Sequence, residues 1–279
     1  QVFSFQRGAR KPEDLSHPVR SIKQRYLQTQ QRAQLAHSIA SVPGAWQFIT
    51  HQGDNQVQLR GFQGSRLPVY LNGIRLTHAG WQPHGSPSFW WSIAPGNMEQ
   101  IEVLRGAGTV TFGSDALGGL IHLQTLAPHY KADGWKVNGE ISAQGSSRGY
   151  FGETGGKLSL SGPKVGIQGG LFLGNIGDRP LGQGDASLDA IGFQTLRGQF
   201  AVRAWLTPKL EVELFNQTHR LEDGSLQTQF GQTYNGAVNE SQRRLNYVRF
   251  KGYSENKWMR TIKFHVSEQF QNRNRTYAW

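Results

Sequence analysis

The fold is decided by residues 101–125, which read IEVLRGAGTVTFGSDALGGLIHLQT. Short apolar runs at 101–104 and 120–123 flank a segment that contains five glycines. Glycine at this density suits neither a helix nor a plain strand, so the pattern predicts a strand, a tight loop and a second strand. Glu102 and Arg105 lie three residues apart, so in a strand they point to opposite faces and each needs its own partner. Charges beside glycines that let backbones pack closely indicate an embedded, crowded element.

This stretch resembles the plug-domain signature of TonB-dependent outer-membrane receptors. The matching positions are Ile101, Glu102, Val103, Leu104, Arg105, Gly106, Phe112, Gly113, Ala116, Gly118, Gly119, Ile121 and Thr125. Ala107 stands where the family usually has proline, and His122 stands where it usually has asparagine. The spacing of the glycines and charges is intact. The resemblance implies a plug domain that closes the pore of an outer-membrane β-barrel.

The residues before this stretch add further elements. An apolar face with helical spacing predicts a helix within 24–39, which ends at Pro43-Gly44. Residues 57–62 predict a short strand, and the runs 68–71 and 74–76 predict a hairpin joined by Asn72-Gly73. An Asn-Gly turn requires positive φ at both residues, which asparagine tolerates. The resembling family has similar elements in the same order.

Composition excludes several classes of protein. The chain has 279 residues, 35 glycines and no cysteine, so it contains neither a disulfide framework nor a thiolate metal site. It has no apolar run of about 18 residues, the length of a membrane-spanning helix. The net charge of +11 comes from basic residues scattered along the chain. This argues against nucleic acid as a partner and favours a positive lumen that attracts anionic ligands.

From residue 130 onward the chain becomes a series of alternating segments of about ten residues, as in transmembrane β-strands. The segments are 135–144, 150–160, 165–173, 193–206, 210–215, 245–253 and 258–266. Short turns and long polar connections alternate between them, which is typical of outer-membrane barrels with short periplasmic turns and long outer loops. Alternation alone does not identify the face that meets lipid, because a strand of a soluble sandwich also has one apolar side.

Seven strands cannot close a barrel, and open edges in hydrocarbon leave backbone groups without partners. Plugged transporters of the resembling family have about 22 strands, so we expect about 15 more after Trp279. The predicted fold is a small α+β plug domain at 1–129 followed by antiparallel transmembrane β-barrel strands at 130–279, an incomplete 22-stranded barrel.

The irregular loop 77–91 is rich in aromatic residues and has two interpretations. Its side chains either pack beneath neighbouring loops or form a ligand surface, since rigid aromatic groups bind at low entropic cost. If the resemblance holds, this loop and 62–66 lie at the outer face of the plug. The predicted ligand-binding residues are Arg66, His78, Trp81, His84, Trp90 and Trp91. His78 and His84 lack an acidic partner nearby, so no metal site is predicted.

The resemblance also implies polar contacts between plug and barrel. Arg60, Glu102 and Arg105 occupy the matching positions and are the predicted plug–barrel contacts. The alternative is that these three residues form salt bridges within the core of the plug.

No enzyme motif and no cofactor motif is present, so neither an enzymatic activity nor a cofactor is predicted. The resemblance implies an outer-membrane receptor for TonB-energised uptake of a scarce ligand such as a ferric siderophore, haem or cobalamin. The partners that the resemblance implies are TonB, a small-molecule ligand of the metal-chelate class, and outer-membrane lipid. One alternative is a soluble all-β module that binds carbohydrate through Trp81, Trp90 and Trp91. Another is a plug-bearing receptor that signals, which requires an additional amino-terminal domain.

Overall fold

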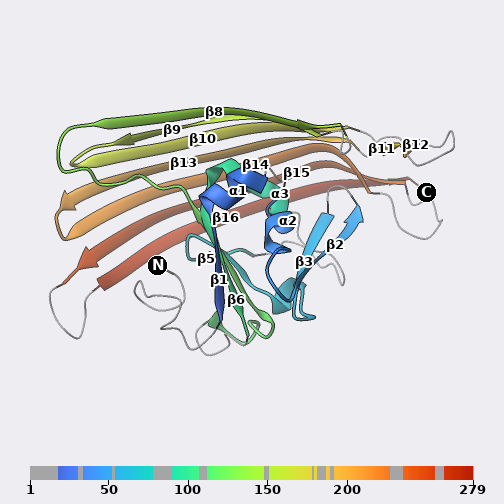
Figure 1. Cartoon of the computed structure of the whole chain (residues 1–279), viewed down its shortest axis with the longest axis horizontal. Coiled ribbons are helices and arrows are strands. Elements are labelled where there is room, and N and C mark those ends of the chain that lie inside the picture. Colours follow the sequence, from blue (N-terminus) through green and yellow to red (C-terminus); the bar gives the residue numbers. More distant parts are fainter. Residues whose placement is uncertain are drawn as a thin grey trace. The chain divides into compact units, whose positions relative to one another are not determined.

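The computed structural model describes residues 18–30, 34–51, 54–77, 89–106, 112–147, 151–177, 179–180, 187–188, 192–226, 235–254 and 261–278. The chain divides into two compact units. The first comprises residues 1–125, 225–237 and 277–279, and the second comprises 126–224 and 238–276. Figure 1 shows the elements of both.

The first unit contains a five-stranded sheet with the order β1-β6-β7-β4-β5. Its strands are β1 (Val19–Lys23), β4 (Val69–Leu71), β5 (Ile74–Arg75), β6 (Met98–Arg105) and β7 (Gly119–Thr125). β7 lies between antiparallel β6 and parallel β4. The predicted strand, loop and strand of residues 101–125 are therefore confirmed at both strands, and they form the centre of the sheet.

Both central strands are buried along nearly their whole length. Such burial produces near-continuous apolar sequence instead of simple alternation, because both faces of the strand are covered. Gly119 lies opposite Arg105 and has φ +142°. A Cβ at this position would lie 2.2 Å from the carbonyl oxygen of Leu104. The close approach of β6 and β7 at this point requires glycine.

Short helices and a second hairpin complete the first unit. They are α1 (Gln24–Gln30), α2 (Leu35–Ile39), η2 (Gly64–Arg66), α3 (Phe89–Ser92), η3 (Pro95–Asn97), β2 (Ala45–His51) and β3 (Asp54–Leu59). The single helix expected within 24–39 is two helices, with residues 31–33 between them outside the described part of the chain. The predicted Asn72-Gly73 hairpin is confirmed, with φ of 50° at Asn72 and 85° at Gly73.

β2 was not predicted, and α3 lies in the loop that was expected to be irregular. None of the helices in the described ranges has the length and apolar character needed to cross a membrane.

The second unit contains a seven-stranded antiparallel sheet with the order β16-β15-β14-β13-β10-β9-β8. These strands are β8 (Lys136–Ser146), β9 (Phe151–Ser161), β10 (Val165–Ile176), β13 (Phe193–Thr207), β14 (Leu210–Leu226), β15 (Asn235–Tyr253) and β16 (Thr261–Ala278). Along the chain, a small pair of strands, β11 (Arg179–Pro180) and β12 (Ser187–Leu188), comes between β10 and β13 and forms a separate two-stranded sheet. Long strands therefore pair with their nearest long neighbours along the chain (Figure 1).

Each predicted segment overlaps one of these long strands, but β14, β15 and β16 extend well beyond their predicted ends. The prediction followed apolar alternation, which stops where the outer residues become polar. Backbone pairing continues past that point, because main-chain hydrogen bonds do not depend on side-chain hydropathy.

Side chains alternate between the two faces of this sheet, as β13 shows most clearly. Leu196, Phe200 and Leu206 are 37%, 48% and 61% exposed on one face. Arg197 and Gln199 are buried on the other face. A sheet with an exposed apolar face and a buried polar face has the reverse of the usual soluble pattern.

Candidate functional site

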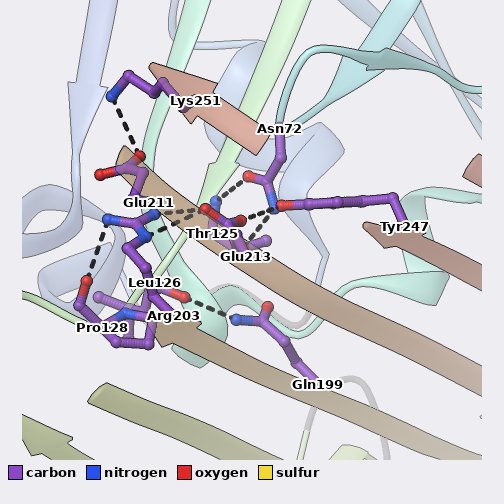
Figure 2. Close-up of polar contacts among 10 residues, drawn as sticks. All are labelled: Asn72, Thr125, Leu126, Pro128, Gln199, Arg203, Glu211, Glu213, Tyr247 and Lys251. Atoms are coloured by element: carbon purple, nitrogen blue, oxygen red, sulfur yellow. Dashed lines mark hydrogen bonds and ion pairs between the residues drawn. The ribbon is translucent and has the colours of Figure 1, made fainter. Parts of the chain in front are cut away.

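The candidate site is built around the segment that begins the second unit (Figure 2). Gln199 Nε2 donates a hydrogen bond to the carbonyl oxygen of Leu126 at 2.8 Å. Arg203 Nη1 donates to the carbonyl oxygen of Pro128 at 3.1 Å. Gln199 and Arg203 lie four residues apart on β13, so strand alternation directs both side chains to the same face. The polar face of this sheet therefore holds main-chain atoms of residues 126–128.

Glu213 on β14 orients the guanidinium of Arg203. Arg203 donates from Nε at 3.2 Å and from Nη2 at 2.6 Å to the same oxygen, Glu213 Oε2. The hydroxyl of Tyr247 donates to Glu213 Oε1. Two residues earlier on the same face, Glu211 Oε1 lies 3.3 Å from Lys251 Nζ. Figure 2 shows that Arg203, Glu213 and Tyr247 join β13, β14 and β15, and that Glu211 and Lys251 form a separate link between β14 and β15.

A second set of contacts fixes Thr125, which ends the 1–125 part of the first unit. Asn72 Oδ1 accepts a hydrogen bond from the N–H of Thr125 at 3.0 Å, and Asn72 Nδ2 donates to Thr125 Oγ1 at 2.9 Å. Asn72 follows Leu71, which pairs with Leu123 of β7, so the asparagine lies beside the end of β7. Residue 125 is thus held within the first unit, and residue 126 is held within the second.

Another buried polar cluster lies on the same face of the second sheet. Arg197 and Glu153 form an ion pair, and both side chains are at most 5% exposed. Gln144 Nε2 donates to Glu153 Oε1 at 2.9 Å. His219 and Arg243 are also buried. Buried charges are expensive unless paired, so this cluster requires the Arg197–Glu153 contact.

The predicted plug–barrel residues all lie on the first unit. Glu102 is fully buried, accepts from Gln100 Nε2 at 3.0 Å, and has His122 Nδ1 3.5 Å from its Oε2. These contacts are within the unit, as in the alternative interpretation. The N–H of Arg105 donates to the carbonyl oxygen of Pro18, and the N–H of exposed Arg60 donates to that of Gly44. That Arg60, Glu102 and Arg105 contact the barrel stays a prediction.

Three of the six predicted ligand residues lie in the described part of the chain. Arg66 is exposed at the end of η2. Trp90 and Trp91 are 2% and 3% exposed on α3, which favours the packing interpretation for these two rings. His78, Trp81 and His84 lie outside the described residues. Within the described ranges, no group of three histidine or acidic residues is arranged as a metal site.

Sequence reasoning did not assign a role to Gln199, Arg203, Glu211 or Glu213. The available signal was the two-residue spacing of Glu211 and Glu213, which places two carboxylates on one face of a strand whose other face is apolar. Which basic groups meet them depends on strand register, which this spacing does not encode.

Comparison with known proteins identifies the family of residues 11–120. Residues 11–120 match the family model "TonB-dependent Receptor Plug Domain". The chain is 30% identical over 149 residues to the vitamin B12 transporter BtuB of Photobacterium profundum, which is 52% of this chain and 23% of that protein. It is 26% identical over 201 residues to an iron-regulated outer membrane virulence protein of Vibrio cholerae, which is 70% of this chain and 28% of that protein. The chain thus spans about a quarter of the length of these relatives.

The fold is also that of a solved receptor. The ferric enterobactin receptor PfeA of Pseudomonas aeruginosa, as a mutant in complex with enterobactin, aligns with a TM-score of 0.68 at 16% identity. The alignment covers 91% of this chain and 41% of the receptor. Residues 11–120 therefore belong to the plug-domain family of the TonB-dependent receptors, which are proteins of the bacterial outer membrane, and the antiparallel strands that follow have the fold of part of a receptor's barrel wall.

Proposed function

We propose that this chain is part of a receptor that binds a scarce ligand, such as a ferric siderophore, haem or cobalamin, and imports it with energy from TonB. The observation that carries the proposal is the plug family match at residues 11–120 in a chain whose later strands have a buried polar face. A wide barrel must be blocked to preserve the permeability barrier of the membrane. The plug must then be displaced within the barrel before a ligand can pass. The function is transport and binding, without catalysis.

The relatives narrow the range of ligands. One is a vitamin B12 transporter and another is an iron-regulated outer-membrane protein. Both names favour a ligand of low abundance, and we propose a metal chelate. The proposed partners are TonB, this ligand and outer-membrane lipid, without nucleic acid.

We further propose that residues 1–129 act as the plug and that 130–279 begin the wall. Arg60, Glu102 and Arg105 are the proposed contacts between them. Of the proposed ligand-binding residues, Arg66 is the described side chain that best suits an exposed site. We propose that His78, Trp81 and His84 also bind the ligand.

Growth rescue tests the function. The complete receptor is expressed in bacteria without their own uptake receptors and supplied with cobalamin, haem or a ferric catecholate as the sole source of that nutrient. We expect one ligand to support growth, and only in cells that contain TonB. Growth in the absence of TonB, or purified receptor that binds none of the three ligand classes, would contradict the proposal.

Two arginine variants give a matched comparison in the same assay. R66A should weaken binding of the active ligand, because it removes an exposed cation from the proposed outer surface. R20A removes an exposed cation from β1, and it should leave binding unchanged. Equal effects of both variants would argue against a specific role for Arg66.

A further inference from the structure

We propose that residues 126–131 are a fixed anchor for the plug, held to the wall by Gln199 and Arg203 as positioning residues. The proposal concerns how the segment after β7 is fixed, and it is independent of ligand and of TonB. Its basis is a continuous series of contacts between this segment and strands of the second unit.

The contacts recur every one or two residues along the segment. Gln199 and Arg203 hold the carbonyl oxygens of Leu126 and Pro128. The ring of Tyr130 packs edge-on against Trp205, with centroids 5.4 Å apart and planes at 73°. The N–H of Lys131 donates to the carbonyl oxygen of Gly162 at 3.3 Å. A flexible linker would lack such a series, so this segment is ordered by the wall itself.

Arg203 suits this position because its guanidinium donates in several fixed directions. Nε and Nη2 are directed at Glu213, which leaves Nη1 to hold Pro128. Tyr247 in turn fixes Glu213. A lysine has one ammonium group on a flexible stem, so it cannot satisfy Glu213 and Pro128 with the same geometry. The ion pair therefore orients the donor that holds the segment.

The backbone of β10 makes room for the segment at Gly166. A Cβ at Gly166 would lie 2.7 Å from Pro128 Cβ, which is closer than real Cβ contacts. By contrast, a Cβ at Gly152 on β9 would meet no atom within 4 Å. Alanine at position 166 should displace Pro128, whereas alanine at 152 should not.

The two consecutive residues at the boundary between the units are each held within their own unit. Thr125 is held by Asn72 in the plug, and the next residue is held by Gln199 in the wall.

A spin label on the anchor tests the proposal. The chain has no cysteine, so H129C introduces one labelling site into it at an exposed residue between Pro128 and Tyr130. The complete receptor carrying this label is studied in detergent by electron paramagnetic resonance, without ligand or TonB. We expect a restricted spectrum. R203Q, Q199L and G166A should each increase the mobile fraction several-fold, and R203K should fail to restore the restricted spectrum.

R220Q and G152A are the matched controls. Arg220 pairs with Glu222 and Glu240 at an exposed position of β14, so its loss removes an ion pair without touching the anchor. Both controls should retain the restricted spectrum. If R203Q accumulates poorly, Q199L remains informative because it leaves Arg203 and Glu213 in place.

A mobile label in the H129C receptor that carries no further substitution would overturn the proposal. An unchanged spectrum when Q199L and G166A are added to H129C would also overturn it. Because the measurement needs no transport, a receptor that fails the growth assay can still show the anchor. A receptor that imports its ligand can equally lack the anchor, so the two proposals fail separately.

Discussion

Asn72 holds Thr125 by two hydrogen bonds, one to its main-chain N–H and one to its side-chain hydroxyl. The same residue occupies the turn between β4 and β5 with a φ of 50°. One asparagine therefore closes a hairpin and fixes the end of the neighbouring strand β7, which is the last element before the wall begins.

Replacing Asn72 separates these two roles. N72A loses both hydrogen bonds and places alanine at positive φ, and we expect it to destabilise the plug by about 1–3 kcal/mol. N72G keeps the turn but loses the hydrogen bonds, so its cost should be smaller. The measurement is urea unfolding of the plug in the complete receptor. Unfolding is monitored by the reactivity of a thiol introduced at buried Ala36. If both variants lose the same stability, the positive φ contributes nothing measurable.

The buried carboxylate of Glu102 is expected to stabilise the plug core. E102A removes the acceptor for Gln100 and leaves buried polar groups without that partner, which costs about 1–3 kcal/mol. E102Q retains a side-chain oxygen in the same place and should cost less. The same thiol-reactivity assay measures both. Unaltered plug stability in E102A would show that its contacts with Gln100 and His122 contribute little.

Gly119 is expected to tolerate no side chain. In G119A the new Cβ meets the carbonyl oxygen of Leu104, a backbone atom that cannot rotate away. We expect loss of folded plug, or destabilisation by more than about 2 kcal/mol. G113A is the control, because Gly113 also has positive φ but open space around it, so its cost should be about 1 kcal/mol. Similar results for the two variants would mean that φ alone sets the requirement.

The exposed pair Arg75–Asp115 gives a pH-dependent prediction. The hydrogen bond from Arg75, at 2.5 Å, lowers the pKa of Asp115 below its ordinary value. A lowered pKa in the folded state means that the pair stabilises the plug above the ordinary pKa of aspartate. This contribution is lost as the pH falls through the lowered pKa. It should be small, because both side chains are solvated.

Unfolding of the unmodified receptor and D115N across the acidic range measures this effect. The two should differ slightly at neutral pH and converge in acid. High salt should also reduce the difference, because it screens exposed charges. A difference that persists unchanged into strong acid would show that Asp115 acts by another route.

Several elements followed directly from short sequence patterns. The hairpin at Asn72-Gly73 and the strands that contain Ile101 and Leu120 were predictable because turn chemistry and apolar runs act over a few residues. The wall strands were predictable in the same way, since period-two alternation is local. Their true lengths were not, because pairing continues where alternation ends, as in β14 and β15.

By itself, then, the sequence determined the central strands of the plug, the Asn72-Gly73 hairpin, the presence of the wall strands and which residues of a strand share a face, because all of these depend on residues close together in the chain. Only the tertiary structure decided that β7 lies between β6 and β4, that Trp90 and Trp91 are buried, and that Arg203 meets Glu213 and Pro128. These relationships join residues far apart in sequence. Alternation fixes the face of a strand, whereas strand order and register decide which partner that face meets.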